Sequence, residues 1–183
     1  VCIRDSNQVD AARAGQHVRD LQRLLTRVGL GNEECVDVDT ELLRVLRVER
    51  VLSVDEGSDT AGTLHTLQFI DPDGTKRFLT GGRIMGCYCS LGRVDGCIYL
   101  AEGYATGATV HAATGHAVAV CFNAGNLKAV ALALRARFPD LCLVIAADND
   151  AATPGNPGVT AAFDAAAAAG ALVAVPGLHE AQS

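Results

Sequence analysis

Residues 97–122 read CIYLAEGYATGATVHAATGHAVAVCF, and the fold prediction starts from this stretch. Two uninterrupted apolar runs, at 97–101 and 117–122, flank a segment of helical composition that ends at Gly115. A strand buried on both faces of a parallel sheet is apolar throughout, whereas a half-buried strand alternates apolar and polar residues. The stretch therefore predicts a buried strand, a crossover helix and a second buried strand.

The same pattern continues toward the C-terminus. Further apolar runs lie at 141–147 and 171–175, and each is preceded by a segment of helical composition, the second of which is rich in alanine at 161–169. The alternation of four strands with three helices implies a parallel sheet with covering helices and right-handed crossovers. We therefore predict an α/β fold in which residues 97–183 form a four-stranded parallel sheet flanked by helices.

The N-terminal third is predicted to be helical. Apolar residues recur at three- and four-residue spacing over 18–28, where Gly29 is a plausible stop, and a second helix is predicted over 40–52. The apolar positions of the first helix are Val18, Leu21, Leu24, Leu25 and Val28. We expect a helical region over residues 1–60.

A β-hairpin is predicted next. Residues 64–70 and 75–79 have strand composition and flank the turn Asp71-Pro72-Asp73-Gly74. The chain from there to Gly96 is irregular and rich in glycine. Residues 61–96 are therefore expected to form the hairpin and a glycine-rich connection, which together with the helical region make a small N-terminal lobe.

The composition limits the class of protein. Of the 183 residues 49% are apolar and 20% are charged, which suffices for a core and excludes a disordered tail. No apolar run approaches the roughly 18 residues of a membrane helix, and the charged start VCIRDSNQVD is unlike a secretory signal. The seven cysteines are predicted to be reduced. We expect a cytoplasmic protein without membrane contact, and the net charge of −6 argues against a free-standing nucleic-acid binder.

Three carboxylates follow the ends of predicted strands. Glu102 comes directly after the strand at 97–101, and Asp148 and Asp150 follow the strand at 141–147. Ligands of open α/β sheets bind outside the carboxyl ends of the strands. With no Arg or Lys interleaved, such a cluster needs a cation, and Mg²⁺ is typically held by one or two carboxylates together with phosphates and water. The pattern predicts a metal site for phosphoryl or nucleotidyl transfer.

Five further residues are weaker candidates for contacting nucleotide or DNA. Arg83 lies in the glycine-rich connection, where a guanidinium could bind phosphate. Asn123, Asn126 and Lys128 lie at the start of a predicted helix, whose N-terminus can bind an anion. Gly103 adjoins the first carboxylate. The alternatives are structural: a surface arginine, helix capping by the asparagines and a solvated helix lysine.

The segment resembles the Toprim domain, the catalytic module shared by DnaG-type primases, topoisomerases and related nucleases. Its signature is a Glu, usually followed by Gly, after the first strand and an Asp-x-Asp after the third, as in Glu102-Gly103 and Asp148-Asn149-Asp150 here. A more specific resemblance is to the primases of plasmids, integrative elements and satellite phages. It is carried by AEGYATGATVHAATG (101–115), FNAGNLKAVALALR (122–135) and the run from VIAADND to the alanine-rich segment (144–171).

This resemblance implies a DNA primase that makes short RNA primers from ribonucleoside triphosphates on a single-stranded DNA template during replication of a mobile element. Glu102 would then be the general acid/base or a third metal ligand, and Asp148 and Asp150 would hold Mg²⁺ or Mn²⁺. A replicative helicase or helicase domain is the implied partner. The chain departs from the family in lacking a preceding zinc-binding module and a basic template surface, so we expect a catalytic fragment.

Two other functions stay open at this point. A Toprim-type nuclease or another phosphodiester-processing enzyme would use the same acidic triad, because a fold does not fix a function. A non-catalytic Toprim module that recruits replication partners would suit the acidic surface. A haloacid-dehalogenase-like phosphatase is disfavoured, because Ala152 stands where that signature needs Thr or Val.

Overall fold

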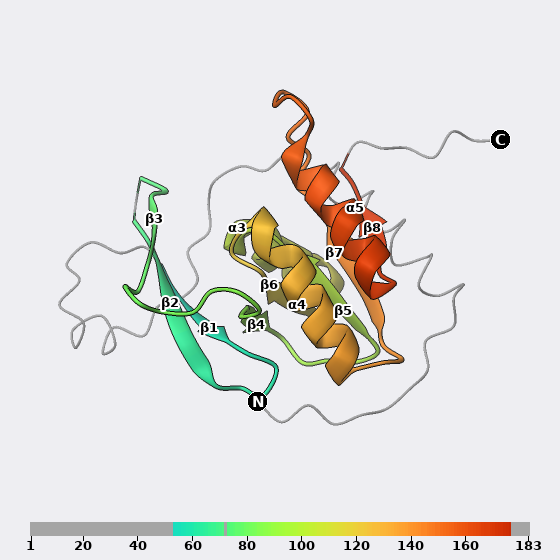
Figure 1. Ribbon diagram of the computed structural model, residues 1–183, viewed down its shortest axis with the longest axis horizontal. Coiled ribbons are helices and arrows are strands. Elements are labelled where there is room, and N and C mark those ends of the chain that lie inside the picture. The colour runs from blue at the N-terminus through green and yellow to red at the C-terminus, as the bar shows by residue number, and fades with distance from the viewer. Residues whose placement is uncertain (1–52, 72, 177–183) are drawn as a thin grey trace.

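The computed structural model describes residues 53–71 and 73–176, which form two β-sheets with helices packed on the larger one (Figure 1). The two helices predicted within residues 1–52 lie outside the described residues. The architecture is the mixed α/β arrangement that the apolar runs predicted.

The smaller sheet is antiparallel, with the strand order β1-β2-β3. Its strands are β1 (Ser53–Ser58), β2 (Leu64–Ile70) and β3 (Lys76–Phe78). Strands β2 and β3 correspond to the predicted hairpin. Strand β1 lies within the region expected to be helical, so the sheet begins before residue 61. The sequence of β1, SVDEGS, is too polar to indicate a strand by itself, and it is the pairing with β2 that forms one.

The larger sheet has the order β4-β6-β5-β7-β8. Four of its strands are the predicted parallel ones, and β4 is an added edge strand that pairs antiparallel with β6. The four parallel strands predicted within residues 97–183 are confirmed, and β4, which lies before them in the chain, was not predicted. Strand β4 escaped notice because it is three residues long and lies among glycines. The bounds are β4 (Cys89–Leu91), β5 (Cys97–Ala101), β6 (Ala117–Val120), β7 (Cys142–Ala146) and β8 (Leu172–Ala174).

Helices cover both faces of this sheet. One face packs against α4 (Ala124–Arg137) and α5 (Pro157–Ala169), which lie side by side in Figure 1, and the other packs against α3 (Tyr104–Thr114). Gly107 lets α3 approach closely, because a Cβ atom there would stand 2.6 Å from Val120 Cγ2. No helix in the described part of the chain is long and apolar enough to traverse a bilayer.

The two sheets are joined next to the carboxyl ends of the parallel strands. Ser58 and Tyr88 exchange two backbone hydrogen bonds of 3.1 and 2.9 Å, which link β1 to the segment entering β4. The rings of Phe78 and Phe122 pack edge to face, with centroids 5.6 Å apart. Because Phe122 follows closely after the end of β6, this contact brings the smaller sheet to the edge at which the three carboxylates were expected.

Candidate active site

Adjacent parallel strands bring Glu102 and Asp148 to one edge of the larger sheet. Strands β5 and β7 pair in register up to Ala101 and Ala146, so the residues that follow them emerge side by side. Glu102 and Asp148 are partly buried, whereas Asp150, in the loop after β7, is exposed. The sheet topology thus places Glu102 and Asp148, which are distant in sequence, at the same edge of the sheet.

The three carboxylates act on one another electrostatically. Burial is the largest cause of a raised pKa at Glu102, and the negative charges of Asp148 and then Asp150 raise it further. Burial is also the largest cause of the raised pKa at Asp148, to which the charge of Asp150 adds. The two aspartates therefore make ionisation of Glu102 harder, and Asp150 makes ionisation of Asp148 harder. Positive charge at this edge would relieve the repulsion.

Glu102 is anchored at the start of α4. Its carboxylate accepts a hydrogen bond from the backbone N–H of Ala124, the first residue of that helix, and this bond lowers its pKa against the larger effect of burial. The first N–H groups of a helix have no partners within the helix and carry partial positive charge. The side chain of Glu102 is thereby directed toward the N-terminus of α4.

Lys76 brings a positive charge to the acidic edge from the smaller sheet. Its Nζ lies 3.6 Å from where a Cβ atom on Gly103 would stand. Its charge lowers the pKa of Glu102 and Asp148 and so partly offsets the increase that burial causes. No Arg or Lys adjoins the three carboxylates in the sequence, but the fold brings this lysine near them. The cation comes from a hairpin distant in sequence, and only the docking of the two sheets brings it near.

Two further residues that the sequence analysis missed hold Asp148 in place. The hydroxyl of Thr106, in the first turn of α3, donates a hydrogen bond of 3.2 Å to Asp148 Oδ1. On the backbone side, Gly158 lies so close that a Cβ atom there would collide with the carbonyl oxygen of Asp148. In the sequence, Thr106 lies in the predicted helix after Glu102-Gly103, and Gly158 follows a proline at the start of a predicted helix. Neither feature indicates a contact with Asp148.

The loop that carries Asp150 is held by asparagine side chains. Asn156 accepts a hydrogen bond of 3.0 Å from the backbone N–H of Asp150 and donates one of 2.8 Å to Asn149 Oδ1. Asn149 in turn donates to the carbonyl of Pro176 at 3.0 Å. Asn156 has a left-handed backbone, with φ of 41°, which asparagine tolerates better than most residues. The exposed carboxylate of Asp150 thus projects from a loop that is fixed at several points.

Comparison with known proteins identifies the larger sheet and its helices. Residues 97–180 match the Toprim domain family. Residues 97–180 form a Toprim domain. The Toprim domain and the sequence before it are similar to two Escherichia coli proteins, each described as DNA primase TraC. One is 39% identical over 188 residues, covering 91% of this chain and 18% of the relative. The other is 42% identical over 127 residues, covering 64% of this chain and 9% of the relative.

A solved structure is also similar, the primase fragment of the bacteriophage T7 primase-helicase protein. It has a TM-score of 0.47 and 16% sequence identity, covering 67% of this chain and 51% of that chain. The chain itself spans 18% or less of the length of the two curated relatives.

The acidic edge of the Toprim domain fits a hard divalent cation bound in an open site. Within residues 53–71 and 73–176, no three His, Cys, Asp or Glu side chains are gathered closely enough to enclose a metal ion by themselves. Carboxylate oxygens are nevertheless the ligands that Mg²⁺ and Mn²⁺ prefer. The donor set suits an ion that takes one or two carboxylates and completes its coordination with phosphate and water.

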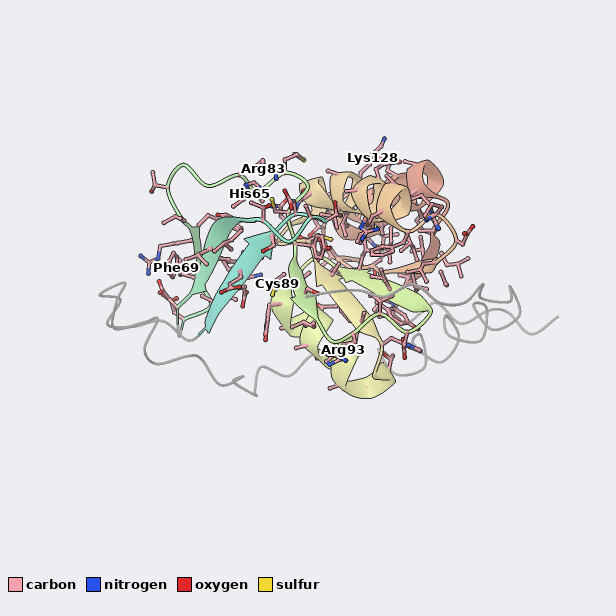
Figure 2. The ribbon with its side chains drawn as sticks, turned by 90° about the horizontal axis from the view of Figure 1, so that it is seen from below. His65, Phe69, Arg83, Cys89, Arg93 and Lys128 are labelled. Atoms are coloured by element: carbon pink, nitrogen blue, oxygen red, sulfur yellow. The ribbon has the colours of Figure 1, made fainter. Side chains whose placement is uncertain are left out.

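Arg83 and Lys128 have the surroundings expected of their structural alternatives. The guanidinium of Arg83 is 3.0 Å from Asp59 Oδ2, which also lies 2.7 Å from Nε2 of His65 (Figure 2). Arg83 therefore helps to fasten the loop after β1. Lys128 is exposed and projects from the outer side of α4 (Figure 2). The structure therefore favours a surface arginine paired with Asp59 and a solvated helix lysine over contacts with phosphate.

Asn123 serves as a helix cap. Its side-chain oxygen accepts a hydrogen bond of 3.1 Å from the backbone N–H of Asn126, which satisfies one of the free donors of α4. Gly103 is the N-cap of α3 and has an extended backbone. Of the five weaker candidates, Gly103 is the residue that lies beside both Glu102 and Lys76.

The prediction that Asn126 contacts nucleotide is corrected by its burial. The residue is 1% exposed. Its amide nitrogen donates to the carbonyls of Ile84, Cys87 and Cys121 at 3.2, 2.8 and 2.9 Å, and its oxygen accepts from the N–H of Gly86 at 2.8 Å. A buried loop without regular pairing needs such partners for its backbone groups. Asn126 therefore joins the segment before β4 to the Toprim domain and has no side-chain atom left for a ligand.

Proposed function

We propose that the chain is part of the catalytic core of a DNA primase, which makes short RNA primers from ribonucleoside triphosphates on single-stranded DNA. The observation that carries the proposal is the similarity to DNA primase TraC, which covers 91% of the chain and extends well beyond the Toprim match. The acidic edge with its adjacent lysine supplies the chemistry that such an activity requires.

In this proposal Asp148 and Asp150 hold Mg²⁺ or Mn²⁺. A bound divalent cation would orient the triphosphate and neutralise the charge that develops during nucleotidyl transfer. The support from this chain is the position of both aspartates at the end of β7 and the repulsion that raises the pKa of Asp148 in addition to burial. The hydrogen bonds around Asn156 keep the loop of Asp150 in a fixed arrangement for this task.

Glu102 is proposed to act on the attacking hydroxyl. The 3′-oxygen of the primer forms a bond to the α-phosphorus of the incoming nucleotide, the bond from that phosphorus to pyrophosphate breaks, and the hydroxyl proton passes to Glu102. A carboxylate accepts a proton more readily when its pKa is raised toward neutrality. Burial and the charge of Asp148 raise the pKa of Glu102 in this direction.

Lys76 is proposed to bind phosphate oxygens of the incoming nucleotide. An ammonium group beside Gly103, the residue that follows Glu102, could reach the same substrate. Single-stranded DNA and a replicative helicase or helicase domain are the proposed macromolecular partners, and the cytoplasm is the proposed location. These last points rest on the resemblance of the chain to primases of mobile elements.

Primer synthesis by the chain tests the proposal directly. The chain is incubated with circular single-stranded DNA, labelled ribonucleotides and Mg²⁺, and in parallel with supercoiled DNA to detect nicking. We expect short labelled products, with a loss of at least about 100-fold in Glu102→Gln and Asp148→Asn. Asp164→Asn, which alters an exposed carboxylate on α5, should keep full activity.

Two results would overturn the proposal. Nicking without primer synthesis would assign the site to a nuclease. Full primer synthesis by both Glu102→Gln and Asp148→Asn would place the reaction elsewhere in the chain.

A further inference from the structure

We infer that Thr106 is a positioning residue for Asp148, whose carboxylate its hydroxyl holds in one orientation at the proposed metal site. The inference deepens the proposed function and rests on it. Thr106 is the third residue of α3 and is 8% exposed. Its Oγ1 lies 3.2 Å from Asp148 Oδ1, across the junction between the helix that follows β5 and the loop that follows β7.

The direction of this hydrogen bond is unusual for the helix in which it occurs. Thr109 and Thr114 donate their hydroxyl hydrogens to backbone carbonyls four residues earlier, Ala105 O at 2.9 Å and Val110 O at 2.7 Å. This is the ordinary behaviour of a threonine within a helix. Thr106 instead donates to a carboxylate 42 residues away in sequence.

The bond restrains the part of Asp148 that the backbone leaves free. Gly158 packs against the carbonyl oxygen of Asp148 and so limits movement of its main chain. Rotation of the carboxylate is a separate freedom, and a hydrogen bond to Oδ1 restricts it. Because Oδ1 is engaged by Thr106, Oδ2 is the oxygen that we assign to the cation. Partners of metal ligands typically change metal affinity by about 10- to 100-fold when they are removed.

Replacing Thr106 by Val separates this role from a purely structural one. Valine keeps the branched shape of threonine and replaces the hydroxyl by a methyl group, which cannot donate the hydrogen bond. Thr106→Ser keeps the hydroxyl and removes a methyl group. Thr106→Ala is compared in parallel, because its smaller side chain leaves room for any adjustment around the lost hydrogen bond. Thr109→Val is the matched control on the same helix.

The experiment measures binding of Mn²⁺ to the full chain by electron paramagnetic resonance, in which free Mn²⁺ gives the signal, with Asp148→Asn as the reference for loss of the site. The apparent Mg²⁺ requirement of primer synthesis is measured alongside. We expect Thr106→Val and Thr106→Ala to raise the Kd for Mn²⁺ by roughly tenfold. Thr106→Ser should stay within about twofold of the wild type, and Thr109→Val should match it.

The outcomes distinguish a failure of the proposed metal site from a failure of the role assigned to Thr106. If Asp148→Asn abolishes binding of Mn²⁺ but Thr106→Val and Thr106→Ala bind it as the wild type does, the metal site stands and the role of Thr106 is refuted. If the wild type binds no Mn²⁺, or Asp148→Asn binds it equally well, the proposed metal site is refuted together with the role of Thr106. A thermal unfolding curve for each variant identifies any loss that comes from unfolding.

Discussion

Lys76 and Gly103 meet across the boundary between the two sheets, with the lysine Nζ 3.6 Å from the place a Cβ atom of Gly103 would occupy. The glycine adjoins Glu102 and is the N-cap of α3, whereas the lysine begins β3 of the antiparallel sheet. The acidic edge of the Toprim domain is therefore faced by a cation that the Toprim domain does not itself encode. A description of the site that stops at the three carboxylates omits this group.

Replacing Lys76 by Ala should weaken the use of nucleotide without unfolding the chain, because the residue is exposed. Loss of a charge-assisted contact to phosphate should lower kcat/KM for ribonucleotides by roughly 10- to 100-fold. The measurement is steady-state primer synthesis at varied nucleotide concentration. Arg77→Ala is the control, since the Arg77 guanidinium pairs with Asp71 at 2.7 Å. Equal effects of the two substitutions would refute a specific role for Lys76.

Gly158→Ala should displace the main chain of Asp148. The added methyl group would collide with the carbonyl oxygen of Asp148, which is backbone and cannot move aside alone. We expect a loss of about 1–3 kcal/mol in the free energy of unfolding, as in other overpacked sites, together with reduced primer synthesis. Urea denaturation and the primer assay measure the two effects. Gly125→Ala, whose new Cβ would lie 3.3 Å from its nearest neighbour, should cost much less.

Asn126→Ala should be far more destabilising than Asn123→Ala. Removing the Asn126 side chain leaves several buried backbone groups without partners, and each such group costs about 1–3 kcal/mol. Removing the Asn123 side chain deletes one helix cap, at a cost of about 1 kcal/mol. Urea denaturation of both variants gives the comparison. Similar losses would show that the loop before β4 does not depend on Asn126.

Asp59 should make part of the stability of the smaller sheet dependent on acid pH. Its pKa is lowered from 3.8 to about 2, first by the hydrogen bond from His65 and then by the backbone N–H of Thr63. Because the pKa is depressed in the folded state, the stabilisation is fully present above 3.8 and is lost as the pH falls through about 2. Thermal unfolding of the wild type and Asp59→Asn should differ most near neutral pH. A difference that stays constant down to pH of about 2 would contradict this assignment.

The strands of the Toprim domain could be predicted because each is a short, continuous apolar run. The runs at 97–101 and 141–147 gave β5 and β7 nearly to the residue. Once these strands are parallel neighbours, their carboxyl ends must adjoin, and this is why Glu102 and Asp148 could be paired from the sequence. Local pattern and chain topology agree here.

Other features depend on contacts that no local pattern records. Strand β1 is polar and β4 is only three residues long, and both form because neighbouring strands offer backbone groups to pair with. Lys76 follows a turn in an ordinary hairpin, and its approach to Glu102 arises only when the sheets dock. The sequence around Asn126 suggests a polar residue near a loop. In the structure its side chain is buried and donates hydrogen bonds to the carbonyls of Cys87 and Cys121.

The union of the two sheets bears on how genes of this kind can recombine. A crossover at residue 97, where the family match begins, would transfer every carboxylate of the edge and leave Lys76 behind. The hybrid would carry whatever residue its new upstream sequence has in place of Lys76. The phosphate contact proposed for Lys76 would then depend on that residue. A segment that keeps the hairpin together with the carboxylates that it faces must therefore begin no later than β1, which pairs with the hairpin and with the chain before β4.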